Sequence, residues 1–251
     1  MVGLGDVATV TGMVLSSMPI SDYDKRVVLI TKERGKIAAF AKGSRRMNSH
    51  LMGVTQPFSF GTFELYEGRA TYNIKQATIT NYFSEVTRNL EAVYYGCYLA
   101  EIADYFSKEN LDASDMINLL YSALKALSND NIPNELIRYV YELKTMVLNG
   151  EYPKVFQCTN CGSKEDLMIF SISTFGMYCK NCRNIPKDGI TISQSSLYTL
   201  QYIISSKIDK LFTFTVSEDV LAELRMVLGR LRNCVFDRPM KSLEMLLLVA
   251  K

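Results

Sequence analysis

The stretch PFSFGTFELYEG, residues 57–68, decides the fold class of the first third of the chain. Its large apolar residues recur at every second position, which is typical of a β-strand with one buried face. Phe58 and Phe60 share one parity, whereas Phe63 and Leu65 share the other. The buried face therefore changes sides at the glycine between these two pairs, which predicts a β-bulge there.

Further strand-like runs lie on both sides of this stretch. They occupy residues 7–17, 26–31, 36–42 and 69–79. Gly35 closes the turn KERG between the second and third runs, in a position that favours a left-handed turn residue. Five short strands within about 80 residues fit a small closed barrel, for which the OB-fold is the common solution. We therefore predict an OB-fold β-barrel over residues 1–80.

Helical spacing of apolar residues replaces strand alternation from residue 81 onward. We predict a helical bundle over residues 81–154 and C-terminal helices over 191–251 that complete it. An apolar stripe runs from Val86 to Cys97, which predicts one helix through this segment. The residues expected to bound helices are Ser114, Pro133, Asn149, Gly150 and Ser217.

Two C-x2-C pairs, CTNC at 158–161 and CKNC at 179–182, are separated by seventeen residues. This spacing is typical of four-cysteine zinc sites. Four thiolates complete a tetrahedral shell around one Zn2+ and leave no open coordination position, so we predict one structural zinc ion in an inserted segment over 155–190. The predicted ligands are Cys158, Cys161, Cys179 and Cys182. The whole chain is thus predicted to be an α+β multidomain protein with an OB-fold β-barrel, a helical bundle and a zinc-binding insert.

The remaining cysteines, Cys97 and Cys234, lie on apolar helix faces and are predicted to be packed core thiols. We expect no signal peptide, because the first residues alternate like a strand and include Asp6. No run approaches the ~18 apolar residues that a membrane span needs. Six cysteines without a secretory signal indicate a reducing compartment, so we expect a cytoplasmic protein.

Residues for catalysis are scarce. His50 is the only histidine and lies on a basic loop, so a triad built on histidine is not expected. No GxxxxGK[ST] phosphate-binding loop occurs. The acid pair Glu218 and Asp219 fits the first turn of a helix better than an acid–base site. We therefore expect no enzymatic activity.

Charge is unevenly distributed along the chain. Residues 1–80 contain ten Lys and Arg against six acids, whereas residues 81–150 contain five against ten. The segment FAKGSRRMNSH, residues 40–50, carries three cations and no acid directly after a predicted strand. A barrel with cationic loops and exposed rings is a common device for binding single-stranded nucleic acid, so we predict that the barrel binds DNA. The predicted DNA contacts are Lys25, Arg26, Lys42, Arg45, Arg46, Arg69 and Lys75. The candidate stacking rings are Tyr23, Phe40, Tyr66 and Tyr72.

A second group of cations lies near the C-terminus. It indicates either a secondary basic patch or the ordinary polar face of a helix, and the sequence leaves both open. Its members are Arg225, Arg230, Arg232, Arg238 and Lys241.

The order of these segments resembles the RecO family of bacterial DNA repair proteins, which are recombination mediators. The resemblance covers essentially the full length and is sharpest in ITKERGKIAAFAKGSRR, residues 30–46. The segment TFGMYCKNC, residues 174–182, departs from the Gly-Gly that many members carry before the third cysteine. Some members lack the zinc ligands altogether.

The resemblance implies a protein that binds single- and double-stranded DNA and anneals complementary strands coated by single-strand-binding protein. It implies RecR as a partner and RecA as an indirect one, since family members help to load RecA on gapped DNA. A basic-rimmed groove in the helical half would receive the C-terminal tail of single-strand-binding protein. The implied location is the cytoplasm, in association with the nucleoid. Carried over by position, Lys42, Arg45 and Arg46 would contact DNA, with Lys25 and Arg26 near them.

Two other function classes remain open at this point. A zinc-containing protein–protein adaptor would use the insert and the acidic bundle as docking surfaces and would lack intrinsic DNA binding. A nuclease or other DNA-modifying enzyme would require a cluster of acids or histidines, which the sequence does not offer.

Overall fold

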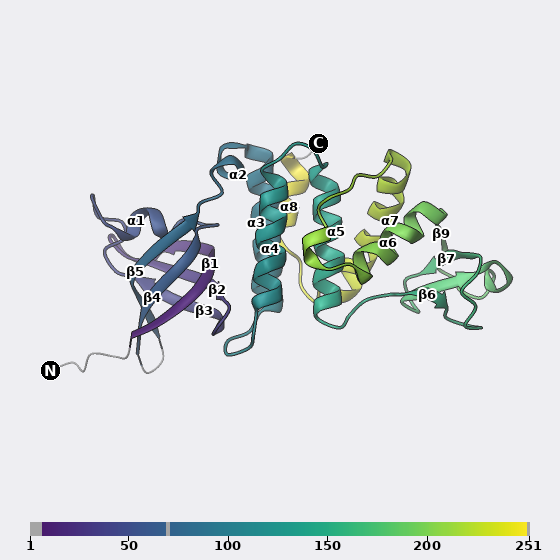
Figure 1. Cartoon of the computed structure of the whole chain (residues 1–251), viewed down its shortest axis with the longest axis horizontal. Helices are drawn as coiled ribbons and strands as arrows, with labels where there is room; N and C mark the ends of the chain where they lie inside the picture. Colours follow the sequence, from purple (N-terminus) through teal and green to yellow (C-terminus); the bar gives the residue numbers. More distant parts are fainter. Residues whose placement is uncertain (1–6, 69–70, 250–251) are drawn as a thin grey trace. The chain divides into compact units, whose positions relative to one another are not determined.

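The computed structural model describes residues 7–68 and 71–249. The chain divides into two compact units, which we call unit 1 (Met1–Ser128 with Met240–Lys251) and unit 2 (Asn129–Pro239). Figure 1 shows the N-terminal strands and the helices that follow them, so the fold is mixed α+β. The predicted domain boundaries at residues 80, 154 and 190 subdivide the chain more finely and stay a prediction.

Unit 1 begins with five strands that close into a barrel. They are β1 (Val7–Pro19), β2 (Lys25–Thr31), β3 (Gly35–Ala41), β4 (Phe60–Glu67) and β5 (Tyr72–Asn81). They hydrogen-bond in the order β1-β2-β3-β5-β4, and β4 pairs back with β1. Only the β3–β5 pairing is parallel within this described sheet. The short helix α1 (Leu51–Val54) lies in the chain between β3 and β4.

Two local predictions for the barrel are confirmed. The register between β4 and β5 shifts between Phe60 and Gly61, where the β-bulge was expected. Gly35 has a φ of +63°, the left-handed conformation expected at the end of KERG. Alternate strand residues point inward, as the pleat requires, and bury the barrel core. This core includes Val10, Val14, Val27, Leu29, Ile37, Phe63, Leu65 and Ile74.

Four further helices belong to unit 1. They are α2 (Ser84–Arg88), α3 (Leu90–Phe106), α4 (Ser114–Leu127) and α8 (Lys241–Val249). The single helix predicted through Val86 to Cys97 is wrong, because Asn89 has an extended backbone (φ −102°, ψ 116°). Its side chain accepts a hydrogen bond from Ala92 N and caps α3, which separates α2 from α3. The apolar stripe continues across this break, so periodicity alone did not reveal it.

The C-terminal helix α8 packs against α3 within unit 1. The Glu101 carboxylate on α3 accepts a hydrogen bond from the backbone N–H of Ser242 at 2.8 Å. Acids near the first N–H groups of a helix stabilise it through the helix dipole. The last helix of the chain therefore belongs with helices that lie more than a hundred residues earlier in the sequence.

Unit 2 combines three helices with a small sheet. The helices are α5 (Asn134–Leu148), α6 (Gln194–Ser205) and α7 (Glu218–Val235), with short 3-10 turns η1 (Lys180–Cys182) and η2 (Ile208–Lys210). The strands are β6 (Lys154–Cys158), β7 (Leu167–Ser171), β8 (Gly176–Cys179) and β9 (Ile190–Thr191), in the order β6-β8-β7-β9. The predicted end of α5 at Asn149 and Gly150 and the predicted cap of α7 at Ser217 are both confirmed. Within the described ranges, no helix combines the length and the apolar character that crossing a bilayer requires.

Candidate nucleic-acid interface and metal centre

The segment after β3, residues 42–48, is here called the basic turn. It lies at the end of the barrel where β2 and β3 pair, since Lys25 is opposite Ala41 in the ladder. Gly43 donates its backbone N–H to the Asp24 carboxylate at 2.8 Å. Arg45 donates its backbone N–H to Tyr23 O at 2.9 Å and its guanidinium to Ser21 O at 2.6 Å. The loop between β1 and β2 thus supports the basic turn through hydrogen bonds of both backbone and side chains.

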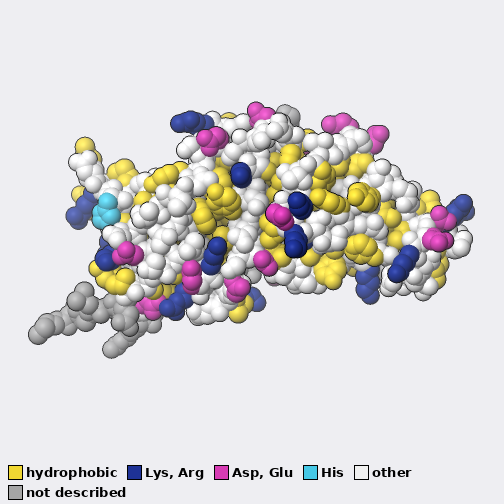
Figure 2. All heavy atoms as spheres, viewed as in Figure 1, with side chains coloured by type: hydrophobic (Ala, Val, Ile, Leu, Met, Phe, Trp, Pro, Cys, Tyr) yellow, Lys and Arg dark blue, Asp and Glu magenta, His cyan; other side chains and the backbone are white. Residues whose placement is uncertain are grey.

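The cations of the basic turn are exposed and carry no compensating acid. Lys42, Arg45 and Arg46 form no ion pair with a carboxylate among residues 7–68 and 71–249. Burial, with a further contribution from the Arg45 charge, lowers the pKa of Lys25 below its usual value. Figure 2 shows Lys and Arg side chains beside the single histidine of the chain, on the barrel. The field at this end of the barrel is therefore positive.

Of the candidate stacking rings, Tyr23 is the one that belongs to this surface. Its side chain is 54% exposed, and the Arg46 guanidinium lies 5.0 Å from the ring centroid. Phe40, Tyr66 and Tyr72 are half-buried. Tyr72 packs against the barrel core. An exposed ring beside unpaired guanidinium groups has the chemistry of a base-stacking site.

The other predicted DNA contacts differ in their surroundings. Arg26 is exposed on β2, opposite Phe40. Lys75 lies on β5, where its ammonium group pairs with the Glu64 carboxylate at 3.0 Å, so its charge is largely compensated. His50 Nε2 lies 3.1 Å from Lys75 O, which brings the end of the loop after the basic turn to β5. Arg69 lies outside the described residues.

The secondary cation group is not gathered on one unit. Arg225, Arg230, Arg232 and Arg238 belong to unit 2, whereas Lys241 begins α8 in unit 1. Arg225 forms a two-pronged ion pair with Glu135, with distances of 2.7 and 2.6 Å. Arg232 is half-buried and lies 3.9 Å from the buried carboxylate of Glu142. Arg225 and Arg232 therefore already have acidic partners.

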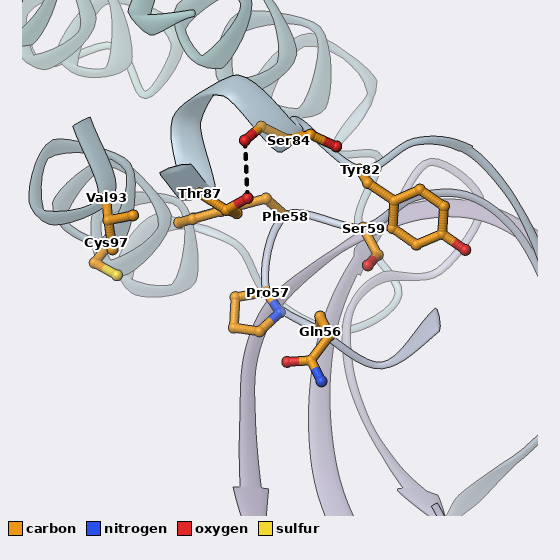
Figure 3. A pocket seen from close by; sticks show the side chains of 9 residues that line it. All are labelled: Gln56, Pro57, Phe58, Ser59, Tyr82, Ser84, Thr87, Val93 and Cys97. Atoms are coloured by element: carbon orange, nitrogen blue, oxygen red, sulfur yellow. Dashed lines mark hydrogen bonds between the residues drawn. The ribbon is translucent and has the colours of Figure 1, made fainter. Parts of the chain in front are cut away.

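A cavity of about 330 Å³ lies in unit 1 between the segment before β4 and helices α2 and α3. Figure 3 shows its wall, in which the Thr87 hydroxyl donates a hydrogen bond to Ser84 O at 3.0 Å. The lining residues are Gln56, Pro57, Phe58, Ser59, Tyr82, Ser84, Thr87, Val93 and Cys97. None of these carries a charge, so the cavity offers a polyanion no compensating cation. It is a separate feature from the basic turn.

The four predicted zinc ligands come together in unit 2. The ligand atoms of Cys158, Cys161, Cys179 and Cys182 all lie within 4.8 Å of one another. The Sγ atoms of Cys161 and Cys179 are 3.7 Å apart. Tetrahedral zinc with Zn–S bonds of about 2.3 Å requires sulfur–sulfur distances of about 3.8 Å. The four sulfurs are therefore close enough together to hold one metal ion.

The sulfurs of the cluster differ in how readily they ionise. Although burial opposes ionisation, backbone N–H groups led by that of Cys161 lower the pKa of Cys158 to about 6. The Asn160 amide donates to Cys182 Sγ at 3.3 Å. Despite this bond, burial and the neighbouring thiols raise the pKa of Cys182 to about 12. Thiolates this close together repel one another. A bound cation would offset that repulsion, which is why thiolate clusters bind metals tightly.

Two sequence predictions about cysteines need correction, and two supporting residues were missed. Cys97 and Cys234, expected in the core, are exposed, and Cys97 lines the cavity beside α3. Ser21 and Asp24, which hold the basic turn, were not recognised from the sequence. Their only signal is the turn-forming run SDYD before β2, and such runs are common in loops.

The sequence matches family models and known proteins over most of its length. The model of the Recombination protein O N-terminal domain matches residues 6–83, and that of the Recombination protein O C-terminal domain matches residues 87–244. DNA repair protein RecO of Acetivibrio thermocellus is 33% identical over 222 residues, which cover 88% of each chain. DNA repair protein RecO of Clostridium perfringens (strain 13 / Type A) is 28% identical over 237 residues, covering 94% of this chain and 95% of the relative. The chain therefore belongs to the RecO family of DNA repair proteins.

Proposed function

We propose that this protein is a recombination mediator that binds single- and double-stranded DNA through the basic turn of its barrel. In this role it anneals complementary strands and helps to load the recombinase on DNA coated by single-strand-binding protein. The proposal involves no chemical turnover, so the protein is not an enzyme. It rests on family membership together with the unpaired cations of the basic turn.

The observation that carries the proposal is the state of Lys42, Arg45 and Arg46. These side chains are exposed and pair with no carboxylate in the part of the chain that the structure describes, so their charges can attract phosphate. Lys25 and Arg26 extend the same charge along β2. Because such contacts address the backbone of the nucleic acid, recognition would be largely independent of sequence.

We assign the barrel to the OB-fold. The strand order β1-β2-β3-β5-β4 with closure onto β1 and a helix between β3 and β4 supports this assignment. OB-folds hold single strands in a groove that combines cations with aromatic side chains. Tyr23, beside Arg46, supplies such a ring.

We assign one structural Zn2+ to the four-cysteine cluster. Four sulfur ligands leave no position for a substrate or a reactive water. The metal would link the ends of β6 and β8, which carry Cys158 and Cys179, to the turns that carry Cys161 and Cys182. Its role would be to stabilise unit 2 rather than to take part in DNA binding.

The proposed partners follow from the family. They are RecR, the C-terminal tail of single-strand-binding protein and, indirectly, RecA, with a location in the cytoplasm at the nucleoid. Support for a role in repair comes from the relatives named DNA repair protein RecO. The residues that would line a groove for the tail are not part of the proposal.

The test is a binding titration of labelled single-stranded DNA at several salt concentrations, with and without Mg2+. The variant R45E/R46E is expected to bind more weakly and to flatten the salt slope by about 1.4, since each lost single-strand contact contributes about 0.7. The control R88E/K125E makes the same change in net charge at exposed positions of α2 and α4 and is expected to bind like the wild type.

Unchanged binding by R45E/R46E would exclude the basic turn from the site. A wild-type protein without DNA affinity at moderate salt would instead favour the protein–protein adaptor. Cleavage of the labelled strand that depends on Mg2+ would favour an enzyme.

A further inference from the structure

We propose that Met47, at the tip of the basic turn, inserts between stacked base pairs of duplex DNA and unstacks them. This inference rests on the proposed function and extends it, because it assigns a mechanical role to the same surface. The turn would then do more than hold phosphates. It would open the stack where strands are to be exchanged.

The first observation is the exposure of Met47. The residue is 90% exposed, the highest value among the exposed large hydrophobic residues that the structure describes. It directly follows Arg45 and Arg46, whose charges are unpaired. Leaving an apolar side chain this exposed forgoes the stabilisation that burial provides, so a partner that covers it gains that free energy.

The second observation is that the tip is held by hydrogen bonds rather than extended freely into solvent. The backbone N–H of Arg46 donates to Gly43 O at 3.1 Å, and that of Ser49 donates to Arg46 O at 3.2 Å. Ser44 is fully buried, and its backbone N–H donates to Ala41 O at 3.4 Å. Asn48, next to Met47, has a φ of +63°, a left-handed conformation that reverses the chain. Met47 therefore lies on a turn whose backbone is held in place by hydrogen bonds, as insertion between bases requires.

The chemistry of the tip fits a base step. Proteins that kink DNA insert apolar wedges, methionine among them, between neighbouring base pairs while adjacent cations hold the phosphates. A thioether side chain is unbranched and polarisable, so it can fill the irregular gap between two bases. Here the wedge and the flanking guanidinium groups occur within three consecutive residues.

The experiment uses the full-length protein and a short duplex that carries 2-aminopurine, a base whose fluorescence rises when it is unstacked. The wild type is expected to raise this fluorescence at saturation. M47A is expected to lose most of the rise while its Kd for the duplex changes by less than about three-fold, because phosphate contacts supply most of the affinity. M47L keeps an apolar wedge and is expected to retain the rise. M226A alters an exposed methionine on α7 and is the matched control.

Each outcome separates the inference from the proposed function. A wild type that binds the duplex without raising the fluorescence, or an M47A variant that keeps the rise, overturns the wedge and leaves DNA binding intact. A wild type that does not bind the duplex overturns both. Sedimentation of the wild type, but not of M47A, with phosphatidylglycerol vesicles and no fluorescence change on the duplex assigns the tip to a membrane and also overturns the inference.

Discussion

The Asp24 carboxylate accepts a hydrogen bond from the backbone N–H of Gly43, with 2.8 Å between Oδ1 and N. This contact ties the loop between β1 and β2 to the basic turn. Through it, a neighbouring acid of this loop binds the backbone of the turn. The guanidinium groups of Arg45 and Arg46 remain without an acidic partner among the described residues. The structure therefore combines a well-supported turn with an uncompensated charge.

Replacing Asp24 tests whether it positions the basic turn. Loss of its negative charge should strengthen DNA binding, whereas loss of its hydrogen bond should weaken it. D24A makes the surface more positive yet removes the acceptor for Gly43 N–H, so we expect weaker binding of single-stranded DNA than in D24N. D24N keeps an acceptor oxygen and removes the negative charge, so we expect binding equal to or tighter than the wild type. D24A should also lose about 1 kcal/mol of unfolding free energy. Fluorescence anisotropy and urea titrations measure both effects. Tighter binding by D24A than by D24N would mean that only the charge matters.

The cysteine cluster gives a second prediction. The wild type is expected to contain one zinc ion per chain by elemental analysis, and C158S/C179S none, because two thiolates cannot complete the shell. The double variant should lose protection of β6, β7 and β8 in hydrogen exchange. C234S removes an exposed thiol on α7 of the same unit and should keep its zinc. One zinc ion per chain in C158S/C179S would show that the ligands are assigned incorrectly.

The ion pair between Glu135 and Arg225 predicts a pH dependence of stability. Burial opposes ionisation of Glu135, but hydrogen bonds from Arg225 and Tyr139 prevail and lower its pKa. A carboxyl group whose pKa is lower in the folded than in the unfolded protein stabilises the fold at pH values above its unfolded pKa of about 4.3. This stabilisation is lost as the pH falls through the folded pKa.

We therefore expect E135Q to be less stable than the wild type at pH 7, and the difference to vanish in acid. A double-mutant cycle with R225Q at pH 7 should give a coupling of about 1 kcal/mol, as for an exposed pair with good geometry. Thermal unfolding of the four proteins at a series of pH values measures this. A difference between E135Q and the wild type that does not change with pH would contradict the assignment.

Gly35 and Gly53 form a matched pair for testing backbone constraints in unit 1. Gly35 has a φ of +63°, and a Cβ there would lie 2.1 Å from Lys108 O and 2.5 Å from Leu111 O. G35A is expected to destabilise the protein by about 2 kcal/mol or more, since the left-handed conformation alone costs about 1–2 kcal/mol. A Cβ on Gly53 meets no atom within 4 Å, so G53A should be neutral or slightly stabilising in α1. Equal stability of the two variants in urea titrations would contradict the predicted strain and steric clash at Gly35.

The local features of the fold were determined by the sequence itself. The bulge at Gly61, the left-handed turn at Gly35 and the end of α5 at Asn149 depend on the conformational preferences of a few neighbouring residues. The C-x2-C spacing likewise specified which four sulfurs meet. The break at Asn89 escaped prediction because the apolar stripe continues through it.

Only the tertiary structure decided which Lys and Arg side chains are compensated by a carboxylate. Lys75 and Arg225 are compensated by Glu64 and Glu135, residues 11 and 90 positions away in the chain. Lys42, Arg45 and Arg46 have no such acidic partner within residues 7–68 and 71–249. The physical reason is that an ion pair forms only where the fold brings two charges within about 4 Å, and the composition of a segment carries no information about that distance. The sequence determined where the charges stand along the chain, and the fold decided which of them remain available to a polyanion.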